Sequence, residues 1–257
     1  MKIIVSVKQV PARDSTLRVN SEGTWLEESE LSYEMNEPDA YALEEALQLR
    51  DKLGGEVVVI CAGPQGATQT IREALAKGAD RAIHVSFEEP AARDALATAR
   101  LLAEAMRPES PEMILTGLQS DDLGYGQTGV ILAELLGYSH ATIVMEVEPQ
   151  ANNMVRVKRE LEDGWFQNIV LPLPVVLTIQ SGIKKLRYAT LMGIKKAKTK
   201  EVKTISPAAR EAHATEAARM ERIYPPQRAK QTQILTGNPK DMAHQLVEKL
   251  RFEARVI

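Results

Sequence analysis

The sequence predicts an α/β protein with a mostly parallel, doubly wound sheet, an antiparallel hairpin extension and a C-terminal arm. Short apolar runs rich in β-branched residues alternate with segments of helical periodicity over residues 2–136. Such alternation implies right-handed crossovers and helices that cover both faces of the sheet. After Gly137 the pattern changes to alternating apolar and polar residues, which is typical of antiparallel strands.

The first half of the chain is expected to form four strands and four helices. Residues 2–7 (KIIVSV) are a short apolar run, expected as a buried first strand. Residues 37–53 have helical periodicity, and Gly54-Gly55 end that helix at its C-cap. The later elements are expected at residues 56–61 (strand), 65–77 (helix), 81–86 (strand), 91–106 (helix), 113–116 (strand) and 127–136 (helix).

The second half is expected to extend the sheet and then leave it. Asn152-Asn153 and Asp163-Gly164 are good hairpin turns between the alternating segments 141–148, 154–161 and 165–171. A further buried strand is expected at 174–179 and a final helix around 239–252. The alanine-rich, charged tail has too little apolar surface for its own core. We therefore predict a domain over 1–205 and an arm over 206–257 that packs on the domain or on a partner.

Composition limits the classes of function. The chain has 257 residues with 32 basic and 35 acidic side chains, a net charge of −3, which argues against a general nucleic-acid or membrane role. The single Cys61 excludes an internal disulfide framework and suits a reducing compartment. No segment is apolar for the ~20 residues of a membrane span. The N-terminus leads directly into a strand rather than a signal peptide, so we expect a cytoplasmic location.

Residues 115–129 (LTGLQSDDLGYGQTG) are the most informative stretch. They are expected to form a strand end, a Gly/Asp-rich loop and the start of a helix, whose free N–H groups and dipole favour an anion. Ligands of parallel sheets bind outside the carboxyl ends of the strands. Three loops leave those ends, at 6–8, at 62–64 and from Gly117 onward, and would converge on one crevice. The pattern predicts a nucleotide phosphate there, although it also fits a plain connecting turn.

Several segments of the sequence, taken together in their order, indicate a protein family more specifically than any one of them alone. They are VSVKQV near the start, MNEPDAYALEEAL at 35–47, ICAGP, TIREALAKGADRAIHV, LTGLQSDD with GQTG, VKRELEDG at 157–164, LPLPVVLTI and RYATLMGIKKAK at 187–198. Together they resemble the small (beta) subunit of electron transfer flavoprotein over essentially the whole chain. Those heterodimers pass electrons from flavin dehydrogenases to a membrane quinone oxidoreductase.

The resemblance implies an adenine-nucleotide-hydrolase-like sheet that holds a structural AMP, with the redox FAD mainly in the alpha subunit. Gln127, Thr128 and nearby amides are assigned to the phosphate, whereas Asp121 or Asp122 would serve ribose hydroxyls, order the loop or form a solvated turn. Carried over by position, the AMP contacts fall at Ser6, Asn36, Glu37, Pro38, Asp39, Ala62, Gly117, Leu118, Gln119, Ser120, Asp121, Asp122, Leu123, Gly124, Tyr125, Gly126, Gln127 and Thr128.

A second flavin is the alternative occupant of this crevice. Relatives that bifurcate electrons bind FAD in place of AMP and carry a Gly-Asp-Thr-Ala-Gln-Val-Gly-Pro run. Residues 123–129 here read LGYGQTG, closer to the AMP form in Gln-Thr-Gly. Some relatives also have a tyrosine near the flavin where this chain has Arg13, so a flavin contact from that loop stays open.

The resemblance also implies surfaces for partners, among them the C-terminal arm over 206–257, which would pack on the alpha subunit. Leu191 takes the place of a protruding leucine that anchors in a pocket on acyl-CoA-type dehydrogenases, and Lys195 and Lys196 lie in a lysine-rich run beside it. An apolar anchor ringed by charge suits an interface, although a lysine run is often a solvated face. Arg159-Glu160 resembles a pair in which the glutamate meets an alpha-subunit arginine and restrains the FAD domain. An ordinary cross-strand pair is the alternative.

The sequence predicts a carrier subunit rather than an enzyme. It has no GxxxxGK[ST] loop, no closely spaced His/Cys set and no GxSxG elbow. A free-standing adenine-nucleotide sensor of the universal-stress type shares the same sheet, but it would not need the tail or the segment around Leu191. An adenylate-transferring enzyme is the third hypothesis, and it would require acid/base residues in the crevice.

Overall fold

The computed structural model describes residues 1–87, 94–206, 217–218, 220–226 and 232–257. It divides into two compact units, Met1–Ile223 and Tyr224–Ile257. Three hydrogen bonds hold described parts of the stretch after 206 to the first unit. Ala217 and Ala218 donate their N–H groups to Asp94 (2.6 and 2.9 Å), and Ile223 donates to the Gly23 carbonyl (2.8 Å). The expected division at 205/206 stays a prediction.

A nine-stranded sheet forms the centre of the first unit, in the order β11-β5-β4-β1-β6-β10-β7-β8-β9. The strands from β11 to β7 in this order pair in parallel, which confirms the mostly parallel sheet. Their bounds are β1 Lys2–Ser6, β4 Glu56–Gly63, β5 Arg81–Ser86, β6 Met113–Gly117, β10 Val175–Ile179 and β11 Val202–Ile205.

Helices cover both faces of this sheet because its central strands are apolar on both sides. Ile3 and Val5 of β1 face a core shared with α1 and α2, whereas Ile4 faces a second core with α3 and α4. All three side chains are fully buried. The helices are α1 Glu37–Leu53, α2 Thr68–Lys77, α3 Ala95–Met106, α4 Thr128–Leu136 and α5 Leu191–Ala197. The doubly wound architecture is therefore confirmed.

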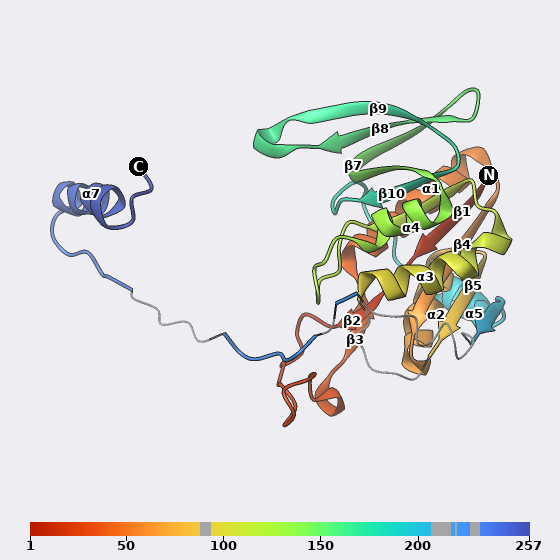
Figure 1. Cartoon of the computed structure of the whole chain (residues 1–257), viewed down its shortest axis with the longest axis horizontal. Helices are drawn as coiled ribbons and strands as arrows, with labels where there is room; N and C mark the ends of the chain where they lie inside the picture. The colour runs from red at the N-terminus through yellow and green to blue at the C-terminus, as the bar shows by residue number, and fades with distance from the viewer. Residues whose placement is uncertain (88–93, 207–216, 219, 227–231) are drawn as a thin grey trace. The chain divides into compact units, whose positions relative to one another are not determined.

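The antiparallel extension is also confirmed, at the upper edge of this unit in Figure 1. It consists of β7 (Ser139–Gln150), β8 (Met154–Glu160) and β9 (Phe166–Pro172), and β7 joins it to the parallel strand β10. Both predicted turns use left-handed backbone. Asn152 and Asn153 have φ of 60° and 57°, and Asp163 has φ of 55°.

Among the described residues, four helices and strands were not predicted, and two helices begin three or more residues later than expected. The additional elements are β2 (Gln9–Pro11), its antiparallel partner β3 (Tyr33–Met35), α5 and β11. The helix expected at 65–77 begins as a 3-10 turn over Gln65–Ala67 before α2. The α3 helix begins after Asp94, whose carboxylate accepts from the Ala97 N–H (2.7 Å) as N-cap. Expected positions 91–93 lie outside the described residues. The remaining 3-10 turns are Glu28–Glu30, Arg107–Glu109 and Glu162–Gly164.

The second unit contains the predicted final helix. α7 spans Pro239–Glu248 and continues as a wider turn over Lys249–Glu253. Asn238 caps it by accepting from the Asp241 N–H (2.9 Å), and Pro239 occupies the first helical position. Among the residues that the structure describes, no helix has both the length and the apolarity to cross a membrane.

Candidate functional site

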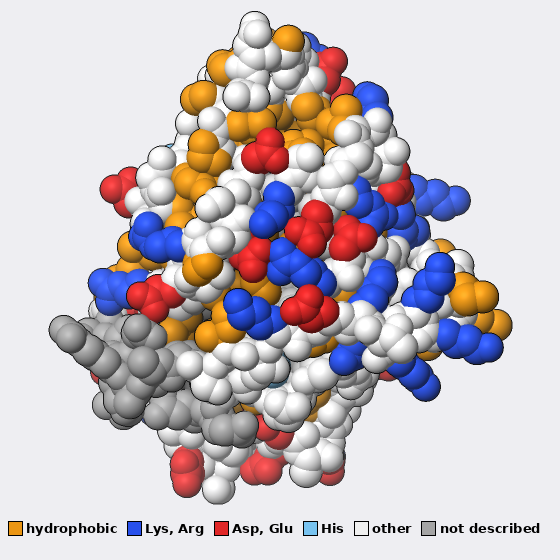
Figure 2. Space-filling model, turned by 90° about the vertical axis from the view of Figure 1, so that its right-hand side faces the viewer, with side chains coloured by type: hydrophobic (Ala, Val, Ile, Leu, Met, Phe, Trp, Pro, Cys, Tyr) orange, Lys and Arg blue, Asp and Glu red, His pale blue; other side chains and the backbone are white. Residues whose placement is uncertain are grey.

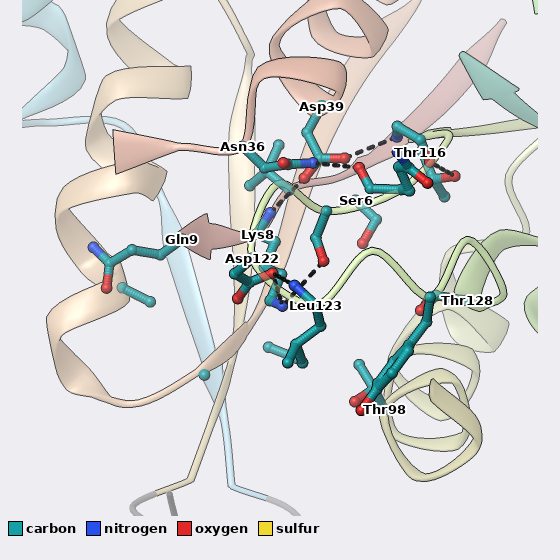
Figure 3. Close-up of a pocket in the computed structure, with 18 of the residues that line it drawn as sticks. Ser6, Lys8, Gln9, Asn36, Asp39, Thr98, Thr116, Asp122, Leu123 and Thr128 are labelled. Carbon is teal, nitrogen blue, oxygen red and sulfur yellow. Dashed lines mark hydrogen bonds and ion pairs between the residues drawn. The ribbon is translucent and has the colours of Figure 1, made fainter. Parts of the chain in front are cut away.

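A cavity of about 600 Å³ opens at the carboxyl ends of β1, β4 and β6 (Figure 3). The chain runs outward from β1 to β4 and β5 on one side and later to β6 and β10 on the other. The boundary between β1 and β6 is thus the point of the sheet where ligands of open α/β folds bind. The volume lies within the ~300–1,000 Å³ range of small-molecule sites.

Most of the predicted nucleotide residues meet at this cavity. Fourteen of the eighteen line it, namely Ser6, Asn36, Asp39, Ala62, Gly117, Leu118, Gln119, Ser120, Asp122, Leu123, Tyr125, Gly126, Gln127 and Thr128. The other four, Glu37, Pro38, Asp121 and Gly124, are not among the lining residues. They lie in the same two segments, the start of α1 and the loop between β6 and α4.

Asp39 links the two strand ends that border the cavity. Its carboxylate accepts hydrogen bonds from the N–H groups of Lys8, after β1, and Gly117, at the end of β6, both at 2.8 Å. Burial raises the pKa of Asp39 to about 7, although both hydrogen bonds oppose that rise. The first turn of α1 therefore fixes the spacing between two loops that border the cavity.

Asn36 fixes the loop between β6 and α4 from the same helix end. Its side-chain amide donates to the Gln119 carbonyl (3.0 Å), and its oxygen accepts from the Asp121 N–H (2.9 Å). Because Asn36 is 1% exposed, these two bonds satisfy a buried amide. Hydrogen bonds within the protein therefore hold the conformation of this loop.

Two glycines allow the backbones around the cavity to approach closely. A Cβ atom at Gly117 would lie 2.5 Å from Asp39 Oδ1 and 2.6 Å from Pro38 Cβ. A Cβ atom at Gly129 would lie 2.5 Å from Thr178 Cγ2 and 2.8 Å from Thr116 Oγ1. Only glycine fits at either position without displacing a neighbour. Gly129 therefore sets the first turn of α4 directly against the ends of β6 and β10.

The N-terminus of α4 supplies amide donors at the cavity. α4 begins at Thr128, and within the described residues no side chain caps it at Gln127. The first-turn N–H groups of a helix have no intrahelical acceptor, and the helix dipole adds partial positive charge. Gln127 and Thr128 both line the cavity. This end of the cavity suits a phosphate or another anion.

Both aspartates of the loop already have cationic partners. Lys8 Nζ lies 2.7 Å from Asp122 Oδ1 (Figure 3) and 3.4 Å from Ser120 Oγ. Burial raises the pKa of Asp122, but the Lys8 charge and hydrogen bonds lower it further, so the net shift is downward. Arg13 pairs with Glu37 and lies 3.4 Å from Asp121. These contacts match the loop-ordering interpretation better than ribose binding.

Several residues that line the cavity were not among the eighteen assigned positions. Lys8, Gln9 and Gly129 lie within three positions of assigned residues, so strand-end proximity could have added them. Trp25 lies in the long connection between β2 and β3, and Thr98 lies in the first turn of α3. Their positions depend on tertiary packing, and no motif in the sequence signals them.

Comparison with known proteins shows the family to which the chain belongs. A family model described as "Electron transfer flavoprotein domain" matches residues 23–210, well over half of the chain. The chain belongs to the electron transfer flavoprotein family. The resemblance noted in the sequence is thereby confirmed. The family name describes carriers of electrons.

Curated relatives from distant organisms match the chain over most of its length. "Electron transfer flavoprotein subunit beta" of Methylophilus methylotrophus is 36% identical over 257 residues, 96% of this chain and 97% of the relative. The mitochondrial subunit beta of Oryza sativa subsp. japonica is 35% identical over 260 residues, with both chains fully covered. The Homo sapiens subunit beta is 35% identical over 210 residues, 80% of this chain and 82% of the relative.

The residues expected to meet partners lie outside the cavity. Leu191 begins α5 and is 82% exposed, and Lys195 and Lys196 of the same helix are exposed. Arg159 and Glu160 lie at the end of β8. Arg159 donates to the Thr142 carbonyl (3.2 Å) and hydroxyl (2.9 Å), while Glu160 accepts from Gln180 (3.2 Å). The two neighbours therefore bond to different parts of the chain and not to each other.

The basic run from 184 to 203 divides into paired and free cations. Lys184, Arg187 and Lys200 bond within the first unit, Lys200 to the carbonyls of Leu75 and Ala79 at the end of α2. Within the described part of the chain, the other basic residues of the run have no ion-pair partner, namely Lys185, Lys195, Lys196, Lys198 and Lys203. Figure 2, viewed from the side where α5 is labelled in Figure 1, shows basic and acidic side chains interleaved.

Proposed function

We propose that this chain is the beta subunit of a heterodimeric electron transfer flavoprotein and holds a structural AMP in the cavity between β1 and β6. The observation that carries the proposal is the uncapped N-terminus of α4, seated by Gly129 against the strand ends at the point where the sheet order reverses. Backbone amides at such a place favour a phosphate without a dedicated P-loop.

The assignments within the cavity follow from the contacts already present. The phosphate would be held by the first-turn amides and side chains of Gln127 and Thr128. Asp121 and Asp122 would order the loop, because Arg13 and Lys8 already engage their carboxylates. The nucleotide would thus stabilise a preformed loop and tie the ends of β1, β6 and α4 together. Its role would be structural.

Electron carriage would depend on partners. The FAD would be held mainly by the alpha subunit, with Glu160 near an alpha-subunit arginine. Leu191, flanked by Lys195 and Lys196, would dock acyl-CoA-type flavin dehydrogenases, since an exposed apolar anchor with free cations around it suits a transient interface. Electrons would then pass to a membrane quinone oxidoreductase. We propose a cytoplasmic location, in keeping with the single buried thiol of Cys61.

A second flavin in the cavity is the other candidate. Beyond the strand ends the cavity is lined by Pro11, Trp25 and Tyr33, which provide apolar and aromatic surface past the proposed adenylate site. Such surface would suit a flat ring system. Membership of the family argues for either nucleotide over a free-standing sensor.

Co-expression with the cognate alpha subunit tests the proposal. We expect a stable heterodimer that carries FAD and is reduced by a flavin dehydrogenase in the presence of its substrate. Size-exclusion chromatography with absorbance at flavin wavelengths measures both assembly and cofactor content. A chain that stays monomeric, beside an alpha subunit that is soluble, would refute the proposed role.

A further inference from the structure

Two buried carboxylates in the middle of α1 face the segment that leads into α5. Glu44 and Glu45 are 4% and 1% exposed, and a buried carboxylate is costly unless a cation or donors compensate it. Each carboxylate is paired with a cation from this segment, which precedes α5. Arg187 Nε lies 2.9 Å from Glu44 Oε2, and Lys184 Nζ lies 3.6 Å from Glu45 Oε2.

Glu44 holds both the main chain and the side chain of Arg187. Its carboxylate accepts from the Arg187 N–H at 3.1 Å and from the guanidinium at 2.9 and 3.2 Å. The same guanidinium reaches Asp51, two turns farther along α1, at 3.1 Å. A planar fork bound at several atoms fixes orientation as well as distance. The backbone is therefore anchored immediately before Tyr188.

Glu45 is the weaker of the two anchors. Its Oε2 atom is buried, and among the described residues it has no hydrogen-bond partner. Lys184 approaches only as an ion pair beyond hydrogen-bond distance. Burial raises the pKa of Glu45, and the Lys184 charge opposes the rise. Glu44 is thus the carboxylate that fixes geometry.

A second anchor lies on the other side of the exposed residues. Thr190 caps α5 by accepting from the Gly193 N–H (3.0 Å), and Gly193 packs its backbone against the Ala76 carbonyl of α2. Between this anchor and Arg187 lie Tyr188 and Leu191, which are 89% and 82% exposed. The exposed side chains therefore sit on a short bridge between α1 and α2 and have little packing of their own.

We propose that Glu44, acting through Arg187, is the positioning residue that sets the geometry of segment 188–192 for docking a flavin dehydrogenase. The inference rests on the proposed function of Leu191 as the docking anchor. A bridge with exposed side chains keeps a defined shape only through its ends, and Glu44 controls one end at three atoms. Without the Glu44–Arg187 contact, Leu191 is still present and exposed but adopts a wider range of orientations. Docking then has to order it, which raises the entropy cost of docking.

The variant Glu44→Gln tests the inference in the assembled heterodimer. The control is Glu73→Gln on α2, which makes the same chemical change in a carboxylate paired with Lys77 at 2.7 Å but distant in sequence from the bridge. For reduction by a flavin dehydrogenase, we expect Glu44→Gln to raise KM roughly tenfold with kcat within twofold. FAD content and direct reduction by dithionite stay unchanged, whereas amide hydrogen exchange over 187–193 becomes faster.

A double-mutant cycle that combines Glu44→Gln with Leu191→Ala separates this inference from the proposed function. We expect Leu191→Ala to raise KM as well, and Glu44→Gln to add little in that background, because both changes affect one docking surface. If Leu191→Ala raises KM while Glu44→Gln matches Glu73→Gln, the positioning role is overturned. If Leu191→Ala itself leaves KM unchanged, the proposed docking function is overturned instead.

The conservative variant Arg187→Lys tests the same inference if Glu44→Gln does not assemble into the heterodimer. It keeps the charge that compensates Glu44 but removes the fork that also reaches Asp51. We expect a heterodimer with normal FAD content and an intermediate rise in KM. A KM equal to that of the wild type would overturn the inference.

Discussion

At the scale of single residues, Asp39 both holds parts of the fold together and lines the cavity. It is a buried carboxylate in the first turn of α1 that accepts from two backbone N–H groups, that of Lys8 just after β1 and that of Gly117 at the end of β6. A helix N-terminus favours a negative side chain, but burial at this position opposes it. The balance leaves the carboxyl group with a pKa of about 7.

This shift predicts a pH dependence of stability. The native carboxyl group of Asp39 keeps its proton up to about pH 7, whereas in the unfolded chain an aspartate loses it near pH 4. The native state therefore binds more protons between these values, and the Asp39 contribution to the free energy of unfolding falls as pH rises from about 4 to about 7. Its full size, about 4 kcal/mol, is present only below that window.

Urea unfolding of the wild type and of Asp39→Asn across pH 4 to 8 measures this contribution. The difference between the two free energies of unfolding should change with pH in the stated direction, because the raised pKa of Glu45 acts equally in both proteins. Asparagine accepts only one of the two N–H groups well, which adds a constant loss of about 1 kcal/mol. A difference that is flat with pH would disprove the shift.

At the scale of elements, α4 depends on how closely it approaches the strand ends. Gly129→Ala would place a methyl group 2.5 Å from Thr178 Cγ2, and overpacking of this kind costs about 1–3 kcal/mol. We expect that loss in the free energy of unfolding, together with weaker nucleotide retention, because the helix end moves away from the cavity.

The matched control is Gly66→Ala. An added Cβ there meets nothing closer than Gln9 Oε1 at 3.9 Å, so the free energy of unfolding should stay within about 0.5 kcal/mol of the wild type. Equal stability of Gly129→Ala and Gly66→Ala would show that α4 does not need the close approach.

Elements buried on both faces were predictable from the sequence, whereas those fixed by tertiary contacts were not. β4 reads EVVVICAG and packs helices on either side, so its composition alone identifies it. α5 is a seven-residue helix that contains Gly193, and a glycine inside so short a helix makes it unstable by itself. It is held by Arg72, which donates to the Ala197 carbonyl at 2.6 Å. β2 and β3 are three residues each and pair across a long loop, which no local pattern indicates.

The same distinction applies to the site. The strand–loop–helix unit at 115–129 was found because its chemistry lies in consecutive residues. Lys8 was not assigned a role, although it forms the ion pair with Asp122. That pair joins residues 114 positions apart, and only the parallel register of β1 with β6 brings them together.

At the scale of the whole molecule, one sheet positions two kinds of surface. The carboxyl ends of β1, β4 and β6 form the cavity, while α1 and α2, packed on one face of the same strands, carry the exposed bridge at 188–192. α1 takes part in both, through Asp39 in its first turn and Glu44 farther along. A subunit built this way needs a rigid centre, and a bound nucleotide would provide it where three loops meet.

The content of the cavity is therefore the central question, and mass spectrometry of nucleotides released on denaturing the purified heterodimer answers it most directly. We predict one AMP for each copy of this chain and one FAD for each heterodimer. Release of FAD alone, with no second adenine nucleotide, would contradict a nucleotide-supported cavity, and two FAD molecules per heterodimer would contradict AMP as its occupant.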